Sequence, residues 1–307
     1  SSCLISWGKI SKNKKCCYCT QEITNFPLDK NKMLIKACIS GDLEVVKELL
    51  KNPSVDPSTE YNEAIIDACI SGHLEVVKEL LKDSRVDPSS RDNYAFRRAS
   101  RQGYLEIVKE LLKDPRVDQS AQNYAIRWAS NNGHLEVVKE LIKDPRVDPS
   151  SLDNFAIGRA SREGHLEIVR ELLKDPRVDP SDAQNYAIRF ASCEGQLEVV
   201  KLLLEDERVD PSENDSIKRA SGNGHIEVVK ELLKDSRVDP SDGENHSIRW
   251  ASKNGHIEVV KELLKDPRVD PTDFKNQSFR KALENDHFNI VTVLLKDPRV
   301  KSKSIRY

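Results

Sequence analysis

A glycine followed by the same amphipathic run returns eight times along this chain of 307 residues, at spacings of 29 to 31 residues. The glycines are Gly41, Gly72, Gly103, Gly133, Gly164, Gly195, Gly224 and Gly255, and a ninth copy of the run carries Asp286 in their place. Self-similarity at such a period is typical of repeat architectures, in which each unit packs only against its neighbours. We therefore expect a stack of small units rather than a globule around one central core.

Each unit is predicted to contain two helices and a connecting loop, as residues 123–150 illustrate. The first helix is expected to start at Asn123, a suitable N-cap, and to end near Gly133, which can adopt a left-handed conformation. The second helix is expected from His134, because apolar residues follow at helical spacing, and it should stop before Pro145. The Arg-Val-Asp-Pro-Ser segment after it is predicted to form a turn or extended connector.

The recurring run resembles the ankyrin repeat. It reads Ala-x-x-x-Gly-His-Leu-Glu-Val-Val-Lys-x-Leu-Ile from Ala129 to Ile142, and the similarity covers residues 30–300. The resemblance implies an all-α, helix-turn-helix solenoid of nine stacked repeats. The chain departs from the family where Tyr-Ala-Ile-Arg replaces Thr-Pro-Leu-His and where Asp-Pro replaces the glycine after the second helix. The unit is also shorter than the family period of about 33 residues, which predicts short finger loops with little or no strand.

The expected organisation is a leader, nine repeats and a tail. The leader spans residues 1–29, and residues 301–307 form a short basic tail. A step of only 29 residues between Gly195 and Gly224 predicts a shortened finger near Pro211. The predicted repeats are residues 30–60, 61–91, 92–121, 122–152, 153–183, 184–212, 213–243, 244–274 and 275–300.

The bulk charge does not favour nucleic acid or an anionic membrane as a partner. The chain has 49 Lys and Arg against 51 Asp and Glu, for a net charge of −2. It has no apolar run long enough to span a bilayer. Seven cysteines without paired spacing indicate a reducing compartment. These features predict a cytoplasmic protein, with the nucleus as an alternative. The uniform Asp-Pro-Arg-Val-Asp-Pro linker resembles repeat families of amoebae and their large viruses, which would place the protein in a host cytoplasm.

One position of the first helix varies between repeats in a way that suggests recognition. Burial of Ile126 and Ala129 would turn Trp128 to the opposite side of the helix. From repeat one to repeat nine, this variable position holds Lys36, Asp67, Arg98, Trp128, Arg159, Phe190, Arg219, Trp250 and Lys281. Aromatic and arginine side chains are those that most often anchor protein interfaces. We therefore expect a partner-binding stripe on the concave, helix-one and finger side of the stack.

Residues one turn before the variable position extend the predicted stripe. The predicted binding residues are Arg98, Trp128, Arg159, Phe190, Arg219, Trp250 and Lys281, with Tyr94, Tyr124 and Tyr186 one turn earlier. Stacking between repeats is the alternative interpretation, in which arginines lie over neighbouring rings and each tyrosine packs against the residue four positions on. Both interpretations can hold, because a stacked arginine is already ordered for binding.

A second basic series lies one position before the variable position, and we predict a structural role for it. These side chains are expected to reach the aspartate of an Arg-Val-Asp-Pro finger. The series consists of Arg97, Arg127, Arg189, Lys218, Arg249 and Arg280, with Gly158 interrupting it.

The sequence offers no arrangement that predicts catalysis, so we expect no catalytic, cofactor-binding or metal-binding residues. Six of the seven histidines occupy one repeat slot, after the repeat glycine or after Asp286 in the ninth copy, and are interpreted as framework residues. The leader contains Cys16-Cys17-Tyr18-Cys19, with Cys3 nearby. A structural zinc site usually needs two cysteine pairs and only one is present. A half-packed leader is therefore favoured over zinc binding or acylation of these cysteines.

The function predicted from the sequence is that of a non-catalytic scaffold or adaptor. Its partner is expected to be a protein with apolar anchors and acidic groups, and the chain is expected to be a monomer. One alternative is a substrate-recruiting arm of a larger assembly such as a ubiquitin ligase. A less favoured alternative is nucleic-acid binding, in which bases would stack on the Arg/aromatic stripe. The fold alone cannot name the partner, since one scaffold hosts many unrelated functions.

Overall fold

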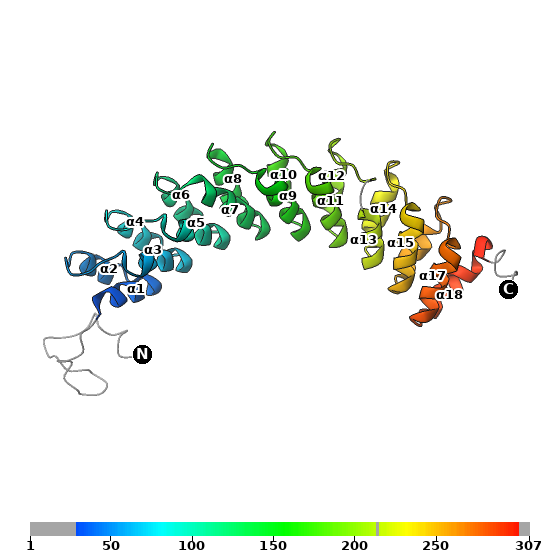
Figure 1. Cartoon of the computed structure of the whole chain (residues 1–307), viewed down its shortest axis with the longest axis horizontal. Coiled ribbons are helices and arrows are strands. Elements are labelled where there is room, and N and C mark those ends of the chain that lie inside the picture. The colour runs from blue at the N-terminus through cyan, green and yellow to red at the C-terminus, as the bar shows by residue number, and fades with distance from the viewer. Residues whose placement is uncertain (1–28, 213–214, 301–307) are drawn as a thin grey trace, which may run out of the picture. The chain divides into compact units, whose positions relative to one another are not determined.

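The computed structural model describes residues 29–212 and 215–300, and within these residues the regular structure is helical, with no strand. Helices α1–α18 follow one another as nine helix-turn-helix pairs (Figure 1). The predicted all-α solenoid with short, strand-free fingers is thereby confirmed. The first helices of the pairs are α1 (Lys30–Ser40), α3 (Thr59–Ser71), α5 (Ser90–Gln102), α7 (Gln119–Asn131), α9 (Ser151–Glu163), α11 (Asp182–Cys193), α13 (Ser216–Asn223), α15 (Asp242–Lys253) and α17 (Asp273–Glu284). The second helices are α2 (Leu43–Leu50), α4 (Leu74–Leu81), α6 (Leu105–Leu112), α8 (Leu135–Lys143), α10 (Leu166–Leu173), α12 (Leu197–Leu204), α14 (Ile226–Lys234), α16 (Ile257–Leu263) and α18 (Phe288–Lys296).

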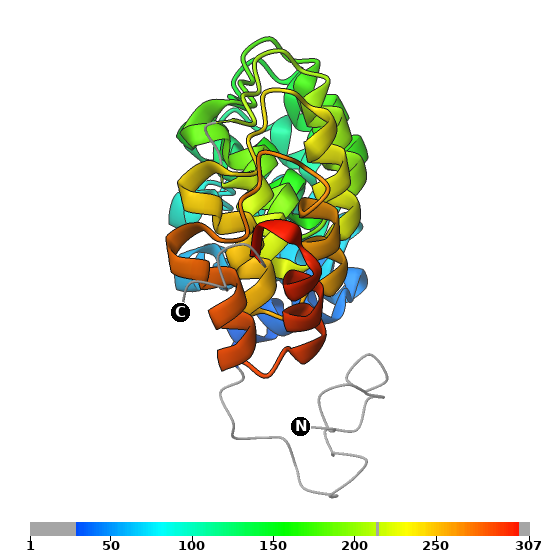
Figure 2. The ribbon, with the colours of Figure 1, turned by 90° about the vertical axis from the view of Figure 1, so that its right-hand side faces the viewer.

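The chain divides into two compact units, one ending at Ala125 and the other beginning at Ile126, so that the boundary lies within α7. In the first unit, α3 packs between α1 and α5, and α4 packs between α2 and α6. In the second unit, the first helices from α9 to α17 pack in sequence, and so do the second helices from α8 to α18. These two rows of the second unit are seen end-on in Figure 2.

The core of each repeat follows the helical period predicted from the sequence. Ile126, Ala129 and Ser130 are 0% exposed, as the prediction for the first helix required. In the second helix, Val138 and Leu141 are also fully buried. Lysine and glutamate pairs three residues apart occupy the exposed side of the second helices, and each such pair stabilises a helix by only a few tenths of a kcal/mol. Burial of apolar surface between neighbouring repeats therefore contributes most of the stability.

The glycine that ends each first helix is held against the following repeat. Gly224 has a φ of +81°, in the left-handed region, and its N–H donates to the carbonyl of Ala220. A Cβ added to Gly224 would stand 2.5 Å from Nδ1 of His256, one repeat on. The Nε2 atom of His256 lies 2.9 Å from the carbonyl oxygen of Gly222. Equivalent links join His73 to Ile39, His165 to Asn131, Gln196 to Arg162, His225 to Cys193 and His287 to Lys253. The recurring histidine thus links repeats.

The start of the first helix differs from the prediction. In α5, Arg91–Asn93 have φ angles between 54° and 57°, so that a left-handed turn precedes the helix proper. Asn93, which corresponds to Asn123 in its repeat, is buried in this turn, and its side-chain oxygen accepts a hydrogen bond from the N–H of Asp118 at 3.3 Å. The N-cap prediction for Asn123 is wrong, because α7 already begins at Gln119.

Asparagine suits this position because it visits the left-handed region more readily than most residues other than glycine. Its amide also joins consecutive repeats, with hydrogen bonds of 2.7 to 2.9 Å to a backbone N–H that lies 25 residues further along the chain. The pairs are Asn31 with Asp56, Asn62 with Asp87, Asn154 with Asp179, Asn185 with Asp210, and Asn245 with Asp270.

The shortened step between Gly195 and Gly224 lies after the finger rather than within it. The finger Asp206–Ser212 keeps the hydrogen bonds seen in the other repeats, and Pro211 in it is buried. The helix α13 begins only at Ser216 and is shorter than the other first helices, so the shortening falls where they begin. The predicted finger shortening near Pro211 is therefore wrong in position.

Candidate partner-binding site

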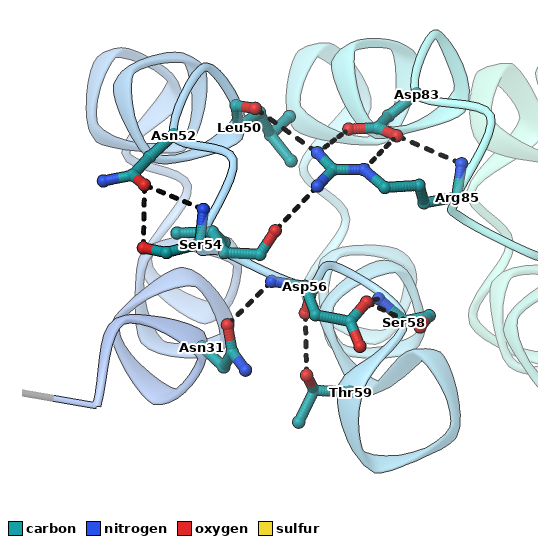
Figure 3. Close-up of polar contacts among 10 residues, drawn as sticks. Asn31, Leu50, Asn52, Ser54, Asp56, Ser58, Thr59, Asp83 and Arg85 are labelled. Atoms are coloured by element: carbon teal, nitrogen blue, oxygen red, sulfur yellow. Dashed lines mark hydrogen bonds and ion pairs between the residues drawn. The ribbon is translucent and has the colours of Figure 1, made fainter.

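The finger loops join neighbouring repeats through an arginine, and the finger that follows α4 shows the arrangement, as it bonds back to the finger that follows α2 (Figure 3). Arg85 donates to both carboxylate oxygens of Asp83, at 2.9 and 2.6 Å. The same guanidinium donates to the carbonyl oxygen of Val55 at 2.7 Å and to that of Leu50 at 3.3 Å, both in the preceding repeat. Charge-assisted bonds of this forked kind are among the stronger ones in proteins.

This arginine link recurs along both units. In each case, the guanidinium bonds an aspartate two residues before it and a valine carbonyl one repeat earlier. The arginine and valine pairs are Arg116 with Val86, Arg177 with Val147, Arg208 with Val178, Arg237 with Val209, Arg268 with Val238 and Arg299 with Val269. The hydrogen bonds from the arginine hold the pKa of the aspartate two residues before it below its usual range, as at Asp83 and Asp206. We call this set of contacts the finger seam.

The second basic series has a structural role, but not with the predicted partner. Arg97 donates to the carbonyl of Arg91 in its own repeat, at 3.0 Å, and its guanidinium lies 4.9 Å from the ring centroid of Tyr124. Lys218 pairs with Asp242 at 2.8 Å, and this aspartate lies at the start of α15 rather than in a finger. For Arg97 and Lys218, the expected bond to the aspartate of an Arg-Val-Asp-Pro finger is therefore wrong. Among those aspartates, Asp87 and Asp179 instead accept hydrogen bonds from Ser89 and Ser181.

The predicted binding residues lie in both units, and we call them together the helix-one face. Arg98, Tyr94 and Tyr124 belong to the first unit, and the others from Trp128 onwards belong to the second. At the variable position, the arginines stack on rings. The guanidinium of Arg98 lies 5.8 Å from the ring centroid of Tyr94, and those of Arg159 and Arg219 lie 4.6 and 5.7 Å from Phe155 and Phe190. Within the described part of the chain, the Nε atoms of these three arginines make no hydrogen bond.

Phe190 is enclosed by its neighbours. Its ring stacks on Tyr186 with centroids 4.1 Å apart, and the guanidinium of Arg162 lies 5.7 Å from it. Gly158 makes room for this arrangement, because a Cβ added there would stand only 2.4 Å from the Tyr186 ring. The interruption of the basic series at Gly158 therefore admits an aromatic ring from the next repeat.

Trp250 has the same position in its repeat as Phe190 but a different environment. It is 52% exposed, and its ring and that of His246 meet at 78° with centroids 6.3 Å apart. Two hollows, of about 390 and 200 Å³, are each lined by both Trp250 and His246. Gly222 of α13 provides space for the indole, since a Cβ there would lie 2.9 Å from Cε3.

The two hollows differ in charge. The larger one is also lined by Glu244, Arg249, Lys253, Gln277 and Lys281. The smaller one is also lined by Asp215, Lys218 and Arg219. The cations of the smaller hollow are paired internally, because Asp215 lies 3.3 Å from Lys218 and 3.6 Å from Arg219. Burial lowers the pKa of His246, and the nearby charges of Arg249 and Lys218 lower it further, so that the neutral imidazole is favoured near neutral pH.

The sequence placed Trp250 and Lys281 in the binding stripe. It singled out Gly222 and Lys253 only as variable turn residues, outside the predicted binding set, and it did not single out His246. The sequence did contain a sign that Gly222 is unusual. It lies within α13, and glycine disfavours a helix. His246 is the one histidine outside the slot after the repeat glycine or its replacement Asp286, which also set it apart in the sequence.

Other candidate chemistry is limited in the described residues. Between residues 29 and 300, omitting 213–214, no group of three His, Cys, Asp or Glu is placed to hold a metal ion. The cysteines Cys3, Cys16, Cys17 and Cys19 lie outside the described residues. Cys38 and Cys69 are buried, and burial raises the pKa of both thiols, so these side chains serve as packing residues. No helix in the described part of the chain is long and apolar enough to cross a membrane.

Paired helices, joined by fingers that bond each repeat to the one before, define a helical-repeat protein. The family model for ankyrin repeats in three copies matches residues 10–92, 96–183, 126–215, 158–244 and 217–304. The chain therefore belongs to the ankyrin-repeat family, as its sequence indicated. No curated protein matched the chain significantly. Ankyrin repeats generally mediate interactions between proteins, and the family is typically non-catalytic.

Proposed function

We propose that this protein is a non-catalytic scaffold or adaptor that binds a protein partner through its helix-one face. The observation that carries the proposal is Trp250, a large aromatic side chain that is 52% exposed between two hollows. Exposing an indole gains nothing for folding, whereas tryptophan is the residue most enriched among side chains that dominate binding energy.

The contrast between framework and helix-one face supports the same proposal. The finger seam uses the same residue types in repeat after repeat, and its polar groups bond each other. The variable position holds Lys, Asp, Arg, Trp or Phe on that constant framework. A partner that fits this face would carry apolar anchors for the rings and acidic groups for the arginines and lysines. The free cysteines Cys38, Cys69 and Cys193 support a reducing compartment such as the cytoplasm.

The test is to compare a triple variant of the face with a matched triple variant of the opposite side. The first carries Trp128→Ala, Phe190→Ala and Trp250→Ala. The control carries Lys139→Ala, Lys201→Ala and Lys261→Ala on the second helices of the same three repeats. Circular dichroism establishes that both variants are folded.

Proteins captured from a cell extract are then crosslinked to the bait, and the crosslinked residues are mapped by mass spectrometry. The proposal expects crosslinks to first helices that are lost in the face variant and kept in the control. Crosslinks that map to the second helices, or that survive in a folded face variant, would contradict it.

A further inference from the structure

We propose that the two hollows beside Trp250 are the anchor site for an acidic peptide segment of the partner. An apolar side chain of that segment would lie against the exposed indole, and a neighbouring carboxylate would occupy the larger hollow. The inference rests on the proposed function, since it names the chemistry that one part of the helix-one face recognises.

The position of the indole is the first argument. Trp250 borders both hollows, so that a bound segment crossing from one to the other must pass over the ring. The contrast with Phe190 shows that the exposure is particular to this repeat. Phe190 is covered by Tyr186 and by guanidinium groups, whereas His246, one turn before Trp250, meets the indole with its ring edge-on and leaves it half exposed. An aromatic ring that is fixed in place and open to solvent can bury a partner's side chain at little cost in conformational entropy.

The balance of charge around the larger hollow is the second argument. Its lining contains three cationic side chains, those of Arg249, Lys253 and Lys281, and one carboxylate, that of Glu244. Lys281 also pairs with Glu284 at 2.7 Å, outside the lining. Lys253 is exposed. Positive charge therefore exceeds negative charge in the lining, and a carboxylate from the partner would complement it.

The order of Arg249 is the third argument. Its side chain is only 8% exposed, and its guanidinium donates to Oε1 of Gln277 at 2.6 Å and to the carbonyl oxygen of Gly243 at 3.2 Å. Its contact with the carboxylate of Glu244 spans 3.8 Å, longer than the forked contacts of the finger arginines. The guanidinium is thus held in place by bonds to neutral oxygens while it contributes positive charge to the lining of the hollow. A carboxylate that enters the hollow would therefore bind a cation that is already ordered, and little side-chain entropy would be lost on binding.

The experiment selects peptides from a random peptide library displayed on phage, using the whole chain as bait. The wild type is expected to enrich peptides in which Asp or Glu lies beside an aromatic or aliphatic residue. Affinities of the enriched peptides are then measured by fluorescence polarisation. The variant Trp250→Ala is expected to bind them about 30-fold more weakly, as for a residue at the centre of an interface.

Charge reversal tests the carboxylate half of the proposal. Lys253→Glu should weaken binding of the same peptides about tenfold or more, because it places like charges together. It should also shift library selection away from acidic peptides. The matched control is Lys265→Glu, which makes the same change in net charge at an exposed lysine that pairs with Glu262. This control should bind as the wild type does.

A third variant moves the indole without changing charge. Gly222→Ala places a methyl group against Cε3 of Trp250, so that the ring must shift. We expect weaker peptide binding with the fold retained. In a Trp250→Ala background, the same Gly222→Ala change should have no further effect on binding, which a purely structural role for Gly222 would not produce.

Three results would overturn the inference. They are a wild-type selection without acidic peptides, acidic peptides that bind Trp250→Ala as tightly as the wild type, and equal weakening by Lys253→Glu and Lys265→Glu. None of these results would contradict the proposed function, because a partner can bind the helix-one face at other repeats. The crosslinking experiment tests that function separately. Loss of crosslinks to all first helices would instead remove the proposed function.

Discussion

The finger seam and the helix-one face use arginine in opposite ways. In the finger seam, the guanidinium of Arg208 bonds both oxygens of Asp206 and the carbonyl of Val178, so that its donors are directed at protein oxygens. On the helix-one face, the guanidinium of Arg159 lies over Phe155, at 4.6 Å, and its buried Nε atom makes no hydrogen bond with any described residue. The first arrangement holds repeats together, and the second covers an aromatic ring at a position that varies between repeats.

The comparison explains why one part of the repeat is constant and the other is not. A finger arginine must match an aspartate and a carbonyl at fixed positions, and lysine could not replace its planar fork. The variable position has no such requirement, because rings, guanidinium groups and ammonium groups all cover the same surface. We therefore expect changes in the finger seam to alter stability, and changes in the helix-one face to alter binding.

Acid should weaken the finger seam more than any single substitution. The arginine hydrogen bonds lower the pKa of the finger aspartates in the folded state, as at Asp83, Asp175 and Asp266. Their contribution to stability is therefore present above the unfolded pKa of about 3.9 and is lost as the pH falls through the lower folded pKa. The midpoint of denaturant unfolding should fall steeply below about pH 4, and a midpoint unchanged between neutral pH and pH 3 would contradict this.

Among single substitutions, Gly224→Ala is expected to have the largest effect. The added Cβ must adopt a left-handed φ and displace the His256 ring, which also weakens the contact of that ring with the Gly222 carbonyl. We expect a loss of about 2–3 kcal/mol in the free energy of unfolding, measured by chemical denaturation. Gly222→Ala is the matched control, since Gly222 is not in the left-handed region. It should leave stability nearly unchanged, and equal losses for the two variants would be evidence against the link.

Removing one finger arginine should cost less. Arg208→Ala deletes the forked bond to Asp206 and the bond to Val178, but the arginine side chain is 42% exposed and solvent compensates in part. The expected loss is about 1–2 kcal/mol. Arg219→Ala on the helix-one face provides the comparison and should lose less than about 1 kcal/mol. A larger loss for Arg219→Ala would reverse the roles assigned to the two regions.

The smallest predicted effects distinguish Phe190 from Trp250, two of the aromatic residues at the variable position. Phe190→Ala removes a ring that is packed against Tyr186 and three guanidinium groups, and should cost about 1 kcal/mol or more. Trp250→Ala removes a half-exposed ring and should cost less, about 0.5 kcal/mol. Thermal melts of the two variants under the same conditions test this order, and a lower melting temperature for Trp250→Ala would contradict it.

The sequence predicted what depends on local periodicity. The spacing of apolar residues correctly predicted the burial of Ile126 and Ala129 and the paired helices. It did not predict the left-handed turn at Asn93, because the partner of its amide, the N–H of Asp118, lies 25 residues away in the chain. Such a bond can be recognised only when the packing of consecutive repeats is known.

The helix-one face was predictable in its residues but not in its details. Phe190 and Trp250 share one position, so the sequence treated them alike, and the alternatives of stacking and recognition stayed open for both. Their environments differ through small residues in the repeat before each one. Gly158 admits Tyr186 onto Phe190, whereas Gly222 seats the indole beside His246. These are contacts between repeats that no pattern within one repeat contains.

The most direct test of this division of roles measures stability and peptide binding together in two variants of neighbouring repeats. Arg237→Ala breaks the finger seam at the carbonyl of Val209, and Trp250→Ala changes the helix-one face one repeat further on. Each variant is assayed by denaturant unfolding and by affinity for an acidic peptide selected with the wild type. We predict that Arg237→Ala loses stability and keeps its affinity, whereas Trp250→Ala keeps its stability and loses affinity. If Trp250→Ala loses stability while a folded sample binds the peptide as tightly as the wild type, the ring is a packing element and the account is contradicted.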